Sequence, residues 1–249
     1  MGAGVGAVVI GVDARGGYDA ALVLNGASYL AYAALVLSVP RVTVTAERPG
    51  LGVVRDGRYV TLAGFVGVLA LCWAMLSSGL PLWVALHTDA PRSISAVVVV
   101  LNSLAIALLQ VRVSRAMVSP CAAARGAVLS GGALALSCVL FALTAGGRGV
   151  TLLLVAAAVQ TAGELLFVAA SWGLSIPLMP PERPGEYQGV FATGEATALM
   201  AAPALMTTLV ADWGQPGWLV LAAIFLLPAV ATVPVTRWAL RTRTVAPAT

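Results

Sequence analysis

Seven long, uninterrupted apolar runs constrain this chain more than any other feature of its sequence. A helix that crosses a bilayer needs about 20 apolar residues, whereas the strands of a membrane barrel show a ten-residue alternating pattern. The runs are continuous blocks, so helices are the expected spanning elements. We predict full spans at 22–39, 60–86, 94–111, 126–145, 150–176, 187–211 and 218–240, a partial helix at 1–12, and a polar turn at 13–19.

Composition supports a membrane protein. Hydrophobic residues make up 60% of the chain and charged residues only 10%, whereas a soluble domain carries about a quarter charged residues. The sequence contains no Lys, so the net charge of +4 comes from Arg alone. Arginines collect at membrane ends for topological reasons, and we therefore expect a polytopic protein of the plasma membrane, in contact with the lipid bilayer and not with nucleic acid.

The arginines also predict an orientation. If the connection 40–59 is cytoplasmic, eleven arginines share that side: Arg41, Arg48, Arg55, Arg58, Arg112, Arg115, Arg125, Arg183, Arg237, Arg241 and Arg243. Only Arg15, Arg92 and Arg148 lie on the other side. The positive-inside rule then predicts a cytoplasmic C-terminus.

The connection 40–59 is the longest and most charged, and it predicts a boundary between two bundles. We interpret 60–240 as a complete six-helix bundle and 241–249 as a cytoplasmic tail. Residues 1–39, with a partial helix and one full span, are interpreted as the tail of a preceding N-terminal bundle, and 40–59 as the cytoplasmic linker between the two.

Two acids fall inside predicted spans. Glu164 lies about 21 Å into its helix, near mid-membrane, and Gln160 is one turn earlier on the same face. Glu195 lies about 13 Å into the next helix. An acid at mid-depth costs roughly 2.5–3.5 kcal/mol or more, so it faces protein or a wet cavity and is a functional candidate. The alternatives are a structural acid bonded to a neighbouring helix for Glu164 and an ordinary solvated residue for Glu195.

Other features argue against different chemistry. The three cysteines have no metal-like or paired spacing, and His87 is the only histidine. Clustered His, Ser–Lys or paired Asp residues at catalytic spacing are missing from the sequence. We therefore expect no metal, no cofactor and no enzymatic activity.

Several motifs resemble one transporter family. They are Ser-Gly-Leu-Pro-Leu-Trp-Val at 78–84, Leu-Asn at 101–102 with Gln-Val-Arg-Val-Ser-Arg at 110–115, Ala-Gly-Glu at 162–164, and Pro-Pro-Glu-Arg-Pro-Gly-Glu-Tyr-Gln-Gly-Val-Phe at 180–191. In this order and on these sides of the membrane, they resemble the second half of a major facilitator superfamily transporter of the actinobacterial, drug-efflux-like kind.

The resemblance implies an all-α bundle containing the end of helix 5 and helices 6 to 12, with the first four helices and most of the fifth missing. Helices 7, 8, 10 and 11 would line a cavity, with Glu164 and Glu195 as proton-coupling candidates and Asn102, Gln160, Trp73 and Phe191 as substrate-cavity candidates. Interhelical bonding remains the alternative for Asn102 and Gln160, and lipid or core contact for Trp73 and Phe191. Arg112 and Arg115 would form an inner loop, which lacks the acid often found there, and Glu182 and Arg183 a solvated inner turn.

The function implied is secondary active transport of a small-molecule substrate, most simply export of amphipathic compounds in exchange for protons. Alternating access needs a second bundle, so the missing N-terminal bundle would be a partner. The alternative is a non-transporting membrane protein or an inactive, truncated half-transporter.

Overall fold

The computed structural model describes residues 15–38, 51–146 and 149–243. The regular elements in these ranges are all helices, without strands, and six helices are long and apolar enough to cross a membrane. The prediction of an all-α membrane bundle is thus confirmed. The predicted partial helix at 1–12 and much of the 40–59 connection lie outside the described residues.

Two compact units divide the chain, one at 1–46 and one at 47–249. In the first unit, α2 (Arg15–Ser38) begins before the span predicted at 22–39. It therefore includes part of the segment predicted as a turn at 13–19. The helix continues outward from the apolar segment because each added residue closes another backbone hydrogen bond. Its apolar stretch, Leu22–Ser38, is shorter than the six spanning helices.

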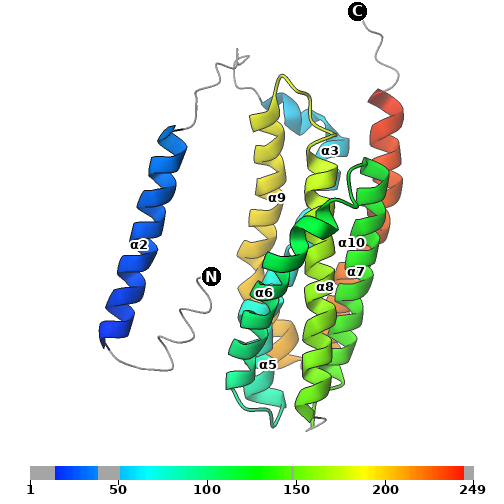
Figure 1. The fold of residues 1–249 in the computed structure, drawn as a ribbon. Coiled ribbons are helices and arrows are strands. Elements are labelled where there is room, and N and C mark those ends of the chain that lie inside the picture. The colour runs from blue at the N-terminus through cyan, green and yellow to red at the C-terminus, as the bar shows by residue number, and fades with distance from the viewer. Residues whose placement is uncertain (1–14, 39–50, 147–148, 244–249) are drawn as a thin grey trace, which may run out of the picture. The chain divides into compact units, whose positions relative to one another are not determined.

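The second unit contains the six spanning helices (Figure 1). The first, Gly57–His87, is built from α3 (Gly57–Leu69), α4 (Leu71–Ala74), the π-helical η2 (Met75–Gly79) and α5 (Leu80–His87), and the short η1 (Leu51–Arg55) precedes it. The others are α6 (Ser93–Ser114), α7 (Pro120–Ala142), α8 (Gly149–Ser175), α9 (Pro184–Leu205) continued by the π-helical η3 (Met206–Asp212), and α10 (Gln215–Arg243).

Local sequence signals begin two of these helices. Asp56 is the N-cap of α3, and its carboxylate accepts a hydrogen bond from the Tyr59 backbone N–H at 3.3 Å. Ser119 caps α7 in the same way, accepting from the Ala122 N–H at 3.2 Å, with Pro120 as the first helical residue. Both patterns satisfy backbone donors that a helix leaves unpaired at its start.

The most extensive contacts between the helices form a series from α6 to α9, and smaller contacts join α8 to α3, α4 and α9. From one end, α6 packs on α8, α8 on α7, α7 on α10, α10 on α3, and α3 on α9. Figure 1 shows α6 crossing α8 at an angle, with α7 beside α8. Only 22% of the apolar window of α6, and the same share for α9, is buried within the bundle, compared with 61% for the Gly57–His87 helix. α6 and α9 therefore keep most of their surface uncovered by this bundle, as does α10, whose window is 28% buried.

Prolines widen two helices without ending them. Pro81 follows the π-helical η2, and Pro203 lies inside α9 just before the π-helical η3. Proline removes a backbone N–H and its ring displaces the carbonyl one turn earlier, so the turn beside it opens. Pro203 does not end its helix, which continues to Asp212. The two widened segments contact each other.

A glycine pair brings α3 and α9 into backbone contact. A Cβ added to Gly67 would lie 2.6 Å from the carbonyl of Gly194 and 3.1 Å from the backbone nitrogen of Glu195. A Cβ added to Gly194 would lie 2.6 Å from the Ala63 carbonyl oxygen. Small residues allow such close approach between membrane helices. The crossing therefore requires glycine on both helices.

Candidate functional site

Glu164 lies in the middle of α8 and is buried inside the bundle, with 5% of its surface exposed. Its carboxylate accepts a hydrogen bond from the Asn102 side-chain amide on α6 at 2.8 Å. The same amide donates to the Thr161 hydroxyl at 3.1 Å. Asn102 and Glu164 are far apart in sequence, so this bond ties two helices together at the depth of the acid.

Gln160 binds the same carboxylate from one turn earlier. Its amide nitrogen lies 3.4 Å from Glu164 Oε2 and 3.1 Å from the backbone carbonyl oxygen of Cys72, on α4. The side chain is fully buried, and its amide oxygen Oε1 has no hydrogen-bond partner in the described structure. Gln160 therefore contacts Glu164 through its amide nitrogen, while its amide oxygen can still accept a hydrogen bond. Leaving such a buried carbonyl unpaired is unfavourable by about 1–3 kcal/mol.

We call Asn102, Gln160, Thr161 and Glu164 the polar cluster. In the part of the chain that the structure describes, the hydrogen-bond partners of the Glu164 carboxyl group are neutral side chains. A carboxylate without a cationic partner is costly at low dielectric, whereas a neutral acid is tolerated. The polar cluster is therefore built to hold a proton or to bind a cation.

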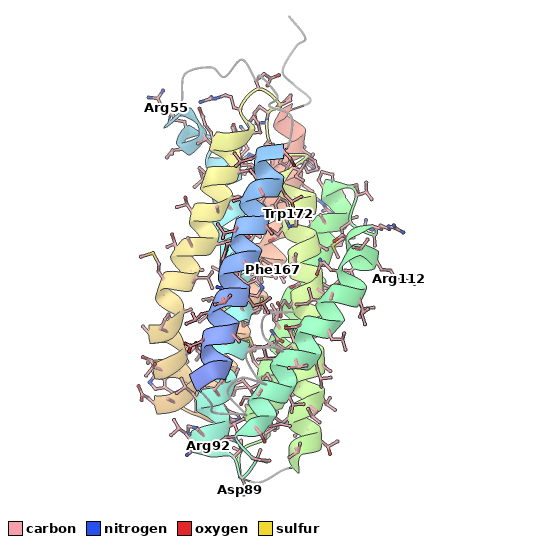
Figure 2. All side chains as sticks on the ribbon, turned by 60° about the vertical axis from the view of Figure 1, so that its left-hand side comes forward. Arg55, Asp89, Arg92, Arg112, Phe167 and Trp172 are labelled. Atoms are coloured by element: carbon pink, nitrogen blue, oxygen red, sulfur yellow. The ribbon has the colours of Figure 1, made fainter. Side chains whose placement is uncertain are left out.

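An aromatic pair borders the cluster. The ring of Trp73 contacts Phe167 edge to face, with centroids 5.4 Å apart, and the Trp73 side chain also lies close to the Glu164 carboxyl group. Phe167 is buried and Trp73 partly buried. Figure 2 shows Phe167 about midway between Arg55 at one end of the bundle and Arg92 at the other.

A groove of about 310 Å³ reaches the cluster between α6 and α8. Asn102 and Thr161 contribute its polar part, and the remaining lining side chains are apolar. A larger groove of about 880 Å³ follows α3 and α9, and none of the predicted site residues lines it. The smaller groove therefore reaches Asn102 and Thr161 of the cluster, whereas Glu164 itself does not line it.

Glu195 lies on α9 and is partly buried. Its carboxylate accepts a hydrogen bond from the Ser171 hydroxyl on α8 at 3.3 Å. Ser171 is two turns from Glu164 on the same helix, so the two acids meet α8 at separate points. The structure thus gives Glu195 its own polar partner rather than a place in the polar cluster.

The remaining predicted residues lie elsewhere. Phe191 is buried in the core, where its ring contacts Tyr59 with centroids 5.8 Å apart. Arg112, Arg115 and Glu182 are exposed. Arg183 forms an ion pair with Glu186 at the start of α9, and its guanidinium lies over Gly52.

Sequence reasoning missed Thr161, whose hydroxyl accepts a hydrogen bond from Asn102, and Ser171, whose hydroxyl donates to Glu195. Both are common in membrane helices, where hydroxyls usually bond to their own backbone. The available signal was spacing. Ser171 follows Glu164 by two helical turns and therefore lies on the same face of α8.

The chain was also compared with known proteins. No protein-family model and no curated protein matches it.

Proposed function

We propose that this chain is the C-terminal bundle of a secondary active transporter of the major facilitator kind, which exports small amphipathic molecules in exchange for protons. The observation that carries the proposal is the buried Glu164 carboxyl group, held in a six-helix membrane bundle by Asn102 and Gln160 and by no cation in the described structure. Ionisable groups inside membrane bundles mark proton and substrate pathways.

Glu164 is suited to coupling because its charge and its hydrogen bonds change together. As a carboxylate it accepts from both amides, whereas as a neutral acid it gains a donor that can pair with an acceptor such as Gln160 Oε1. Gaining or losing a proton therefore alters the bonds that join α6 to α8 and α4. A carrier needs this link between protonation and helix packing.

The uncovered surfaces of α6 and α9 support a second bundle. Alternating access rocks two bundles around a site near the membrane midplane, and α6 and α9 leave most of their surface uncovered here. In this proposal a second bundle faces α6 and α9, and amphipathic solutes are bound between the two, with Trp73 contributing an aromatic contact. The plasma membrane is the proposed location, with the arginine-rich ends of the helices and the C-terminus in the cytoplasm.

Transport by reconstituted protein tests the proposal. Full-length wild-type protein in vesicles should move an amphipathic dye when a pH gradient is imposed, and Glu164→Gln should abolish the pH-driven part of the flux. Glu182→Gln is the matched control, because Glu182 is an exposed acid in the turn before α9. Equal pH-driven flux in wild type and Glu164→Gln would refute the coupling role, and absence of any flux in wild type would refute transport.

A further inference from the structure

One face of α8 carries more polar groups than the polar cluster alone. Gln160, Glu164, Phe167, Ser171 and Ser175 follow each other at intervals of three or four residues, so they lie on one side of the helix. All five are buried. Phe167 is the only apolar member, and it lies between the part of the face that holds Glu164 and the part that holds Ser171.

Beyond Phe167, the polar groups continue towards the ends of α3 and α9 that begin at Gly57 and Pro184. Ser171 donates to Glu195 at 3.3 Å, and the Gln188 amide donates to the Ser175 hydroxyl at 3.4 Å. The Tyr59 hydroxyl lies 3.5 Å from the Ser175 carbonyl oxygen.

This series reaches the helix ends themselves. The hydroxyl of Tyr187, near the start of α9, donates to the Asp56 carboxylate at 3.2 Å. Asp56 caps the start of α3. Polar side chains from α3, α8 and α9 therefore extend from the Ser171–Glu195 pair to the end of the bundle that is predicted to be cytoplasmic.

A barrier separates this series from the polar cluster. Glu164 and Ser171 are about 10 Å apart along the helix axis at 1.5 Å per residue, which is too far for direct proton transfer. The Phe167 and Trp73 rings contact each other in this interval, and Phe167 is 1% exposed. Proton transfer between the two acids therefore requires the rings to part and admit water.

We propose that Glu195, positioned by Ser171, is a second proton-binding group that carries protons between Glu164 and the end of the bundle near Asp56, and that Phe167 and Trp73 form the barrier between the two acids. The proposal deepens the transport function and rests on it. During export, Glu164 gives up its proton through water to the Glu195 carboxylate, and Glu195 then releases the proton to the aqueous phase. When the solution is acidified, the same two steps run in reverse and load Glu164. Only O–H bonds break and form.

The other groups near these acids fit a path for protons. In the described segments, Cys72 on α4 is the titratable side chain that faces both acids, and it is fully buried. Tyr59 on α3 and Tyr187 on α9 are the titratable groups next along the path, followed by Asp56. The side chain that α6 contributes to the polar cluster is that of Asn102, which is neutral and does not titrate.

The rate at which Glu164 takes up a proton tests the proposal without any solute. Full-length protein in lipid nanodiscs is mixed rapidly with acid, and the infrared band of the protonated carboxyl group is followed in time. The band that is lost in Glu164→Gln belongs to Glu164. Glu195→Gln should slow the rise of this band by about a hundredfold, within the range that one positioned acid–base group contributes. Glu195→Asp should keep a rate close to that of wild type.

Two further variants separate a path from a general disturbance. Phe167→Leu keeps an apolar side chain but removes the ring, and it should speed the rise of the Glu164 band. Glu182→Gln, at the exposed turn before α9, should leave the rate unchanged. Circular dichroism in the same nanodiscs shows whether each variant is folded.

The results that overturn this inference differ from those that overturn transport. A Glu164 band that rises equally fast in wild type and Glu195→Gln, or that never forms, removes the proposed path. A failure of pH-driven dye flux in vesicles, with the Glu164 band still dependent on Glu195, would instead remove the transport function and keep the path. A rate unchanged in Phe167→Leu would remove the barrier.

Discussion

The bond between Asn102 and Glu164 is the interaction that most directly ties α6 to the rest of the bundle. Asn102→Ala removes two interhelical hydrogen bonds, to Glu164 at 2.8 Å and to Thr161 at 3.1 Å. Such bonds contribute on average about 0.6 kcal/mol each in a membrane protein, and at most about 1.7. The free energy of unfolding of the variant should therefore be about 1–2 kcal/mol lower than that of the wild type.

Reversible unfolding of the full chain in mixed detergent micelles, titrated with a denaturing detergent, measures this free energy. Ser103→Ala is the matched control, because the Ser103 hydroxyl donates only to the Val99 carbonyl oxygen of its own helix, at 2.9 Å. Removing that bond leaves contacts between helices intact. The control should change the free energy of unfolding by less than about 0.5 kcal/mol, as expected away from special features.

A double-mutant cycle isolates the bond itself. Asn102→Ala is combined with Glu164→Ala, which removes the acceptor, and the coupling energy between the two sites should reach roughly 0.5–1.5 kcal/mol, in the range for contacting residues. A coupling energy within about 0.3 kcal/mol of zero, the scatter of independent sites, would refute the claim that Asn102 acts through Glu164. A loss of stability equal to that of Ser103→Ala would refute the interhelical role altogether.

Two further predictions concern packing and exposure. Gly131→Ala should lower the free energy of unfolding by about 1–3 kcal/mol, as overpacking does, because the new Cβ would lie 2.2 Å from the Ala229 side chain of α10. Gly132→Ala is the control and should leave this free energy unchanged, because the space at its Cβ is open. Equal effects of the two variants in the same micelle titration would contradict the α7–α10 contact. Cys121 is exposed and the two other cysteines are buried, so a membrane-impermeant maleimide should label one thiol per chain. With the predicted orientation, this label should be added only from the cytoplasmic side. Labelling from the outside alone would show that the orientation is the reverse of the predicted one.

The spanning helices could be predicted from sequence because their signal is local. An apolar block of about 20 residues is sufficient to define a span. Six of the seven predicted blocks correspond to helices long and apolar enough to cross a membrane, and the block at 22–39 corresponds to a shorter apolar helix. The bond between Gln160 and Glu164 could also be predicted from the sequence, because residues four apart meet on one helix face. Neither inference needs to know how the helices pack together.

The partners across helices could not be predicted in this way. Asn102 meets Glu164 only because α6 crosses α8 at one particular register, and a different crossing would bring other side chains to the acid. The pairing of Ser171 with Glu195 depends likewise on the contact between α8 and α9. The widened turns at η2 and η3 were missed for another reason: proline indicates a disturbed helix, but neighbouring helices decide whether it bends, breaks or widens.

The contact between Gly67 and Gly194 has a consequence for how this protein can vary. Glu195 is the residue next to Gly194, and its backbone nitrogen would lie 3.1 Å from any Cβ at position 67. The location of Glu195 on α9 therefore depends in part on the absence of a side chain at Gly67 of α3. In a search for homologues, a replaced glycine at 67 and a displaced or missing acid at 195 should occur together, so the three positions are best treated as one inherited unit.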